Sequence, residues 1–144
     1  MTAPITKPSQ LKPGQLSFMM EALQMFAAMA NANSREHGFY DEHDRIHNFL
    51  ADKLGGEAET KYLLDIRLSK IALIHSELGE MTEGVRKPGP DQHLPEFTQE
   101  EVEAADTFLR LMDYAHEWGL RFAEAVVAKM EYNASRPYKH GKGA

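Results

Sequence analysis

The sequence predicts an all-α protein, a helical bundle of about four to five helices in one domain. Apolar residues recur at helical spacing over most of the chain, and no useful stretch alternates apolar and polar residues as a strand does. Clusters of Pro and Gly separate the helical stretches. A length of 144 residues with 42% apolar content suits one domain with its own core.

The composition limits the chemistry that the protein can use. There are no cysteines, which excludes disulfides, thiolate metal sites and cysteine nucleophiles. No stretch reaches the ~20 apolar residues of a membrane span, and the N-terminus lacks the apolar core of a signal peptide. We therefore expect a cytoplasmic protein without a membrane partner. The formal net charge of -6 argues against binding to nucleic-acid polymers.

The N-terminal part of the chain is expected to hold a flexible arm and two helices. Residues 1–14 contain three prolines and few apolar residues, which is typical of an arm that precedes a folded domain, here residues 15–136. A break around Gly38 separates the two helices. The predicted helices run from an N-cap at Ser17 to about Ala32, and from Asp41 to about Leu54.

The next helix is expected to be long, from about Glu57 to Arg86. Glu77 and Glu80 fall on a sector that is otherwise apolar, about 100° from the main apolar stripe of this helix. This position argues against a simple solvated face. The main stripe, which we expect to pack in the core, consists of Leu64, Ile71, Ile74, Leu78, Met81 and Val85.

Two further helices follow a loop rich in Pro and Gly. Thr98 and Glu101 form a capping-box pattern, in which each side chain bonds the backbone of the other residue. The helix that they begin is expected to reach about Glu117. Its apolar stripe is Val102, Ala105, Leu109 and Met112, and a polar stripe beside it is Glu103, Asp106, Arg110 and Asp113. A last helix is expected from about Leu120 to Ser135, followed by a basic tail of residues 137–144.

The most informative pattern is a pair of acidic motifs, Glu77-x-x-Glu80 and Glu103-x-x-Asp106, separated by the 22 residues 81–102. Residues three apart on a helix share a face, so each motif places two like charges side by side. On two antiparallel helices the four carboxylates would surround a small volume. Hard oxygen donors of this kind suit Mg²⁺ or Mn²⁺.

A cationic counterpart to the acids lies near the C-terminus. Lys129, Asn133 and Arg136 share one face of the last helix at i, i+4 and i+7, where they would contact a phosphate bound through the metal. The bases of the tail, Lys139 among them, have two interpretations. They either close over a polyphosphate or form a frayed, solvated terminus.

These motifs resemble those of the MazG-like nucleoside triphosphate pyrophosphohydrolases. The residues that carry the resemblance are Ser76-Glu77-Leu78-Gly79-Glu80, Glu103-Ala104-Ala105-Asp106, and the run Lys129-Met130-Glu131-Tyr132-Asn133-Ala134-Ser135-Arg136-Pro137. The resemblance covers roughly residues 60–142. The stretch 33–41 is also similar to the longer N-terminal region of some phage-type members.

The resemblance implies an all-α homodimer or homotetramer whose active site, between the acidic helices, is completed by oligomerisation. It implies Mg²⁺-dependent cleavage between the α- and β-phosphates of a (deoxy)nucleoside triphosphate, giving monophosphate and pyrophosphate, in nucleotide housecleaning or recycling. Carried over by position, Glu77, Glu80, Glu103 and Asp106 are the metal ligands, or one of them is the general base. By the same carry-over, Lys129, Asn133 and Arg136 contact phosphate or orient the ligands.

Two other interpretations stay open. The acids could form a solvated face of a non-enzymatic helical interaction module. Alternatively, Asp44-x-x-His47 and Asp113-x-x-His116 have the spacing of ligands in a di-metal carboxylate redox bundle, although such bundles use Glu-x-x-His motifs.

Four single residues also have alternative roles. Phe39, Tyr40 and Trp118 could stack on a base or pack in the core. Arg110 is expected to pair with Asp106, which lies four residues earlier on the same helix.

Overall fold

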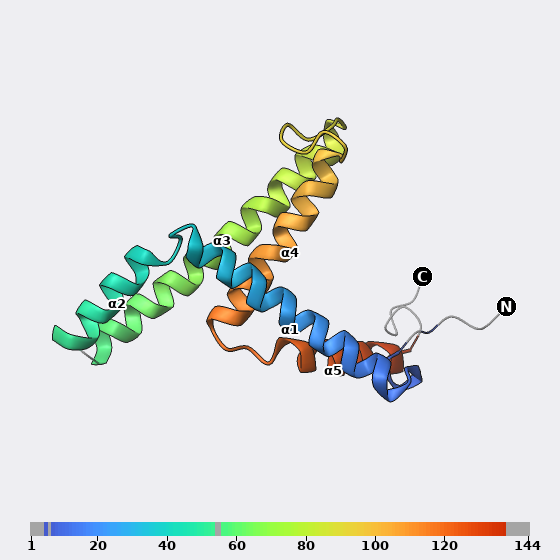
Figure 1. Ribbon diagram of the computed structural model, residues 1–144, viewed down its shortest axis with the longest axis horizontal. Helices are drawn as coiled ribbons and strands as arrows, with labels where there is room; N and C mark the ends of the chain where they lie inside the picture. Colours follow the sequence, from blue (N-terminus) through green and yellow to red (C-terminus); the bar gives the residue numbers. More distant parts are fainter. Residues whose placement is uncertain (1–4, 6, 54–55, 138–144) are drawn as a thin grey trace.

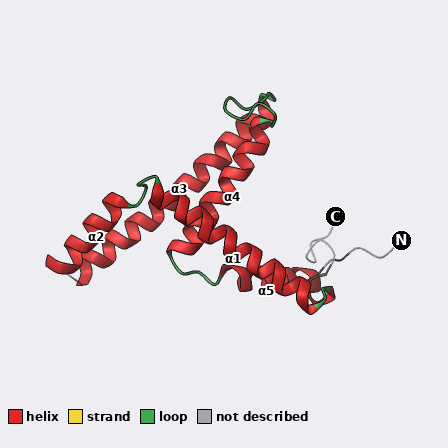
Figure 2. Ribbon diagram, viewed as in Figure 1, coloured by secondary structure: helices red, strands yellow, loops and turns green. Residues whose placement is uncertain are grey.

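The computed structural model describes residue 5 and residues 7–53 and 56–137 (Figure 1). The five α-helices within these ranges are α1 (Pro13–Glu36), α2 (Asp41–Lys53), α3 (Gly56–Arg86), α4 (Gln99–Glu117) and α5 (Phe122–Ser135), with a short 3₁₀ turn η1 (Pro8–Gln10) before them. The described part of the chain has no β-strand, and Figure 2 shows helices joined by loops. The predicted all-α class is confirmed.

The helices form three two-helix arms that meet near the C-terminal end of α1 (Figure 1). The first half of α3 packs against α2, and its second half runs antiparallel to α4. Helix α1 crosses α4 and continues beside α5. Among the described helices, none is long and apolar enough to cross a membrane.

Most helix boundaries agree with the sequence predictions. Thr98 caps α4 as expected: its hydroxyl oxygen accepts a hydrogen bond from the backbone N–H of Glu101 at 3.2 Å, and the Glu101 carboxylate accepts one from the Thr98 N–H at 2.8 Å. Gly38 lies within the α1–α2 connection in a left-handed conformation with φ of 76°, which glycine adopts without steric cost.

The start of the first helix differs from the prediction. Helix α1 begins at Pro13, where the fixed φ of proline suits the first helical position, and Ser17 lies inside the helix with its hydroxyl bonded to Glu21. The predicted flexible arm of residues 1–14 is therefore too long. Pro8 is buried, and the backbone N–H of Ser9 donates to the Glu131 carboxylate of α5 at 3.0 Å.

The core is small and sits where α1, α4 and α5 meet. Its buried members are Ala27, Ala30 and Met112, with Leu111 and Phe122 packed against them. Large apolar side chains are exposed elsewhere, and those more than half exposed on α1 and α3 are Phe18 (72%), Met25 (57%), Met29 (61%), Leu64 (55%), Leu68 (55%) and Val85 (54%). These residues leave broad apolar faces on a single chain.

The predicted apolar stripe of α3 is only partly covered. Leu64, Leu78 and Val85 of that stripe are exposed, and Ile71, Ile74 and Met81 are partly buried, whereas Glu77 and Gly84 are buried. Gly84 allows a close approach of the two helices, because a Cβ atom there would lie only 2.8 Å from the Glu100 backbone nitrogen. The second, acid-bearing sector of α3 therefore faces α4.

Candidate metal and nucleotide site

The antiparallel pairing of α3 and α4 brings the two acidic motifs together. Glu77 is 6% exposed and Glu103 is 8% exposed, while Glu80 lies at the surface. One carboxylate oxygen from each of these three residues lies within 4.8 Å of the other two. We call Glu77, Glu80, Glu103 and Asp106 the acid cluster. Three of its four predicted members are thus brought within reach of a single ion.

The fourth member, Asp106, lies one helical turn beyond Glu103 and outside this 4.8 Å group. Partial burial and then the charge of Glu77 raise its pKa, while Arg110 lowers it. Burial, followed by the negative charges of Glu80 and Glu77, also raises the pKa of Glu103. The acid cluster therefore carries repulsion that a cation would relieve.

Arg110 is the one cation of the described residues that forms an ion pair with the acid cluster, and its partner differs from the prediction. Its Nε atom lies 2.6 Å from Oε1 of Glu77 on α3, whereas the sequence suggested Asp106 on its own helix. The partner across the helix pair is buried, and a charge pair is screened less there than on an exposed helix surface. Arg110 neutralises one of the buried carboxylates.

The predicted phosphate contacts on α5 do not meet the acid cluster within one chain. Helix α5 packs on α1 and η1, and it lies on a different arm from the Glu77 and Glu103 region (Figure 1). Lys129, Asn133 and Arg136 are all exposed, and Lys129 and Arg136 lie over the Tyr132 ring, 4.8 and 5.8 Å from its centroid. Lys139 lies outside the described residues.

A groove of about 740 Å³ opens beside the acid cluster, between α1, α3 and α4. Asp106 and Arg110 line one part of it, and Lys70, Asp113 and Phe39 line another. Lys70 is not part of the predicted site. The signal in the sequence is its position seven residues before Glu77, which places both on the same face of α3.

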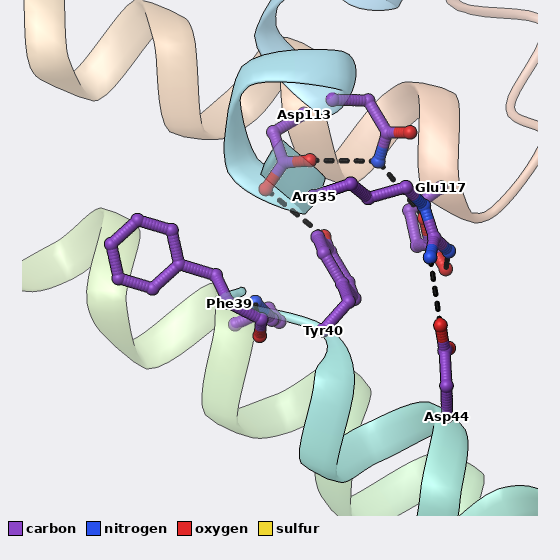
Figure 3. Close-up of polar contacts among 8 residues, drawn as sticks. Arg35, Phe39, Tyr40, Asp44, Asp113 and Glu117 are labelled. Carbon is purple, nitrogen blue, oxygen red and sulfur yellow. Dashed lines mark hydrogen bonds and ion pairs between the residues drawn. The ribbon is translucent and has the colours of Figure 1, made fainter. Parts of the chain in front are cut away.

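A second group of charged residues lies where α1, α2 and α4 meet. We call Asn31, Arg35, Tyr40, Asp44, Asp113 and Glu117 the polar hub (Figure 3). Asp113 accepts hydrogen bonds from the Asn31 amide at 2.9 Å and from the Tyr40 hydroxyl at 3.0 Å. Arg35 pairs with Glu117 at 2.7 Å and with Asp44 at 2.9 Å, as Figure 3 shows. Burial, and then the Asp113 charge, raise the pKa of Tyr40.

The ligand-like Asp-x-x-His spacings do not form a shared redox site. Asp113 is occupied by the polar hub, and His116 is exposed. His47 pairs with Glu59 at 2.9 Å. His43, which the sequence analysis did not consider, lies within 4.8 Å of Asp44 and Glu117, but the Arg35 guanidinium already binds both of those carboxylates.

The aromatic candidates separate into two groups. Tyr40 is only 1% exposed and Trp118 is partly buried, so both pack in the interior of the protein. Phe39 is 68% exposed and lines the groove. No protein-family model, curated protein or solved structure matches the chain.

Proposed function

We propose that the protein is a Mg²⁺-dependent nucleoside triphosphate pyrophosphohydrolase, which cleaves between the α- and β-phosphates. One observation carries the proposal: Glu77, Glu80 and Glu103 of two helices place carboxylate oxygens within 4.8 Å of one another, and two of these side chains are buried. Buried like charges repel, as the raised pKa of Glu103 reflects, and a cation bound between them would relieve this repulsion. The resemblance in the sequence assigns metal binding to the same residues.

The donor set fits the proposed ion. The acid cluster offers only carboxylate oxygens, which suit Mg²⁺ or Mn²⁺ better than the softer metals that favour nitrogen and sulfur. Glu77, Glu80 and Glu103 would hold the ion. When bound, Mg²⁺ withdraws charge from phosphate oxygens and lowers the pKa of a coordinated water.

The remaining side chains have separate roles in this proposal. Asp106 lies outside the group that would hold the ion and has a raised pKa, which suits a general base that accepts a proton from the attacking water. Arg110 lines the groove and would neutralise phosphate oxygens. No covalent protein nucleophile is needed, because water attacks the phosphorus directly.

A second copy of the chain would complete this site. Within one chain the cationic face of α5 lies away from the acid cluster, and large apolar side chains on α1 and α3 are exposed. A homodimer or homotetramer would cover part of this apolar surface and bring Lys129, Asn133 and Arg136 of one copy to the acid cluster of another. Cationic residues and a carboxylate-bound metal together suit a polyphosphate.

The central test is product analysis on a panel of (d)NTPs with and without Mg²⁺. We expect pyrophosphate, not orthophosphate, to be released only with the metal. Glu80→Gln should abolish release while leaving the helix content unchanged, and Glu100→Gln on the exposed start of α4 is the matched control. Equal pyrophosphate release by wild type and Glu80→Gln would refute the site.

A mixing experiment tests the contribution of the second copy. Glu80→Gln and Arg136→Ala should each be inactive alone. After the two are unfolded and refolded together, about a quarter of the wild-type activity should return, since half of random dimers are mixed and each has one intact site. No recovery, in mixtures shown to contain mixed dimers, would place Arg136 outside the neighbour's site.

A further inference from the structure

The groove beside the acid cluster has the dimensions and lining of a site for a flat, partly polar molecule. It extends along α4 from Asp106 to Asp113, which corresponds to about 10 Å of helix. Its apolar lining residues are Phe26, Met29, Ala30, Phe39, Leu73 and Leu109, and its polar ones are Asn33, Ser34, Lys70, Asp106, Arg110, Asp113 and Tyr114. Arg110 and Lys70 are the cations among them. Apolar walls combined with polar groups that can fix orientation are typical of small-molecule sites.

Phe39 lines the groove, although little of its side chain is buried against the protein. Its ring is 68% exposed, whereas the next residue, Tyr40, is 1% exposed. Figure 3 shows the two rings pointing in different directions, with Tyr40 directed to Asp113. Exposing a large aromatic ring costs free energy, so its fixed position requires other contacts.

Those contacts come from the backbone around Phe39. Its N–H donates to the Ser34 carbonyl at 3.0 Å, and its own carbonyl accepts from Lys70 Nζ at 3.4 Å. Lys70 Nζ also lies 3.8 Å from the centroid of the Tyr40 ring, and the Tyr40 hydroxyl donates to Asp113 at 3.0 Å. These contacts hold the α1–α2 turn against α1, α3 and α4.

We infer that this groove takes the nucleoside part of the substrate, with the base stacked on Phe39. The orientation follows from charge: the triphosphate lies toward Arg110 and the acid cluster, and the base lies toward the α1–α2 turn. Tyr40 and Asp113 act as positioning residues for the Phe39 ring. The nature of the ligand rests on the proposed function, but the location of the stacking contact does not require hydrolysis.

Asn33 adds a group that can discriminate between bases. It is exposed, lines the groove, and its side-chain amide has no hydrogen-bond partner among the described residues. An amide offers both a donor and an acceptor, so it pairs with the edge of a base that presents a matching acceptor and donor. The apolar walls alone would not distinguish one base from another.

The test compares binding of two kinds of probe in the presence of Mg²⁺: the deoxynucleoside monophosphates and inorganic triphosphate, which has no base. Phe39→Ala should weaken the binding of monophosphates by about tenfold, since base stacking on an aromatic ring supplies much of such affinity. Inorganic triphosphate should bind unchanged. Phe49→Ala is the matched control, because Phe49 is also an exposed aromatic residue (59%) but does not line the groove.

Two further variants separate stacking from a general structural effect. Phe39→Trp should retain or improve monophosphate binding, whereas Phe39→Leu should behave as Phe39→Ala. Tyr40→Phe removes only the hydroxyl that reaches Asp113, and it should raise KM for nucleotide several-fold while kcat stays within about twofold.

Three results would overturn the inference. They are wild-type monophosphate affinity in Phe39→Ala, no monophosphate binding to the wild type, and a change of oligomeric state in Phe39→Ala, which would assign the groove to a second copy. Failure of the proposed hydrolysis gives a different pattern. In that case the wild type releases no pyrophosphate, while the Phe39 variants still report on base binding.

Discussion

The acid cluster and the polar hub contain similar residues and differ in how these residues are satisfied. In the polar hub, Asp113 accepts two hydrogen bonds, and Arg35 joins Glu117 to Asp44. In the acid cluster, the ion pair between Arg110 and Glu77 is the one salt bridge among the described residues. The hub is complete within one chain, whereas the cluster has an excess of negative charge. The contrast fits a hub that stabilises the fold and, under the proposed function, a cluster that binds a cation.

The largest expected effect of a mutation is on the acid cluster. Glu103→Gln should lower the rate of pyrophosphate release by at least about a hundredfold, because it removes a carboxylate charge needed to hold the metal. Without metal the same change should raise the unfolding temperature, since it relieves the repulsion that raises the pKa of Glu103. Activity and thermal unfolding in EDTA measure the two effects. If Glu103→Gln loses activity and also unfolds at a lower temperature than the wild type in EDTA, Glu103 serves the fold alone.

The polar hub should respond in the opposite way. Asp113→Ala should destabilise the protein by about 3 kcal/mol, since it leaves the buried Tyr40 hydroxyl without an acceptor and removes one of the two acceptors of the Asn31 amide, the other being Glu117. Chemical denaturation measures the change, and Asp65→Ala on the exposed side of α3 is the control. A loss below about 0.5 kcal/mol would mean that the hub contributes little to the difference between the two regions.

The gain in stability on addition of Mg²⁺ should show which of the two regions binds the metal. For a site with a Kd of ~1 mM, 10 mM Mg²⁺ should stabilise the wild type by about 1.4 kcal/mol, which is a few degrees in Tm. Asp113→Ala should keep this increment although its Tm is lower, and Glu103→Gln should lose it. An equal increment in all three proteins would indicate general ionic effects, not a site at the acid cluster.

The two regions also differ in how far the sequence predicts them. The acid cluster follows from local spacing, because i, i+3 pairs share a helix face and the capping box at Thr98 fixes where α4 begins. In the polar hub, Asp113 lies 82 residues after Asn31 and 73 residues after Tyr40, and no local pattern links them. Helix boundaries and acid pairs are thus local properties that a sequence specifies directly.

The missed features depend on how the helices pack. Arg110 pairs with Glu77 across two helices, and half of the apolar stripe of α3 is exposed while Glu77 and Gly84 are buried. Helical periodicity identifies two sectors on α3, but it does not say which one a neighbour covers. The sequence likewise does not predict that α5 lies away from the acid cluster, because the position of α5 depends on how α1 packs against α4 and α5.

The smallest expected effect concerns pH at the edge of the polar hub. Burial lowers the pKa of His43; the nearby Asp44 and Glu117 oppose this shift, while His47 and Lys70 add to it. The unfolded chain therefore binds a proton more readily than the folded one, so stability should fall as the pH drops through the usual histidine pKa of about 6.5.

His43→Phe should remove this part of the pH dependence while keeping the ring contacts with Tyr62 and Trp118. Unfolding temperatures between about pH 7.5 and pH 5.5 measure it, with His116→Gln, an exposed histidine of α4, as the control. The loss of stability on acidification should be smaller in His43→Phe than in either the wild type or the control. Equal losses in the three proteins would mean that His43 gains its proton as readily in the folded state, beside Asp44 and Glu117, as in the unfolded chain. The polar hub would then contribute no pH dependence, and its contrast with the acid cluster would rest on the mutations alone.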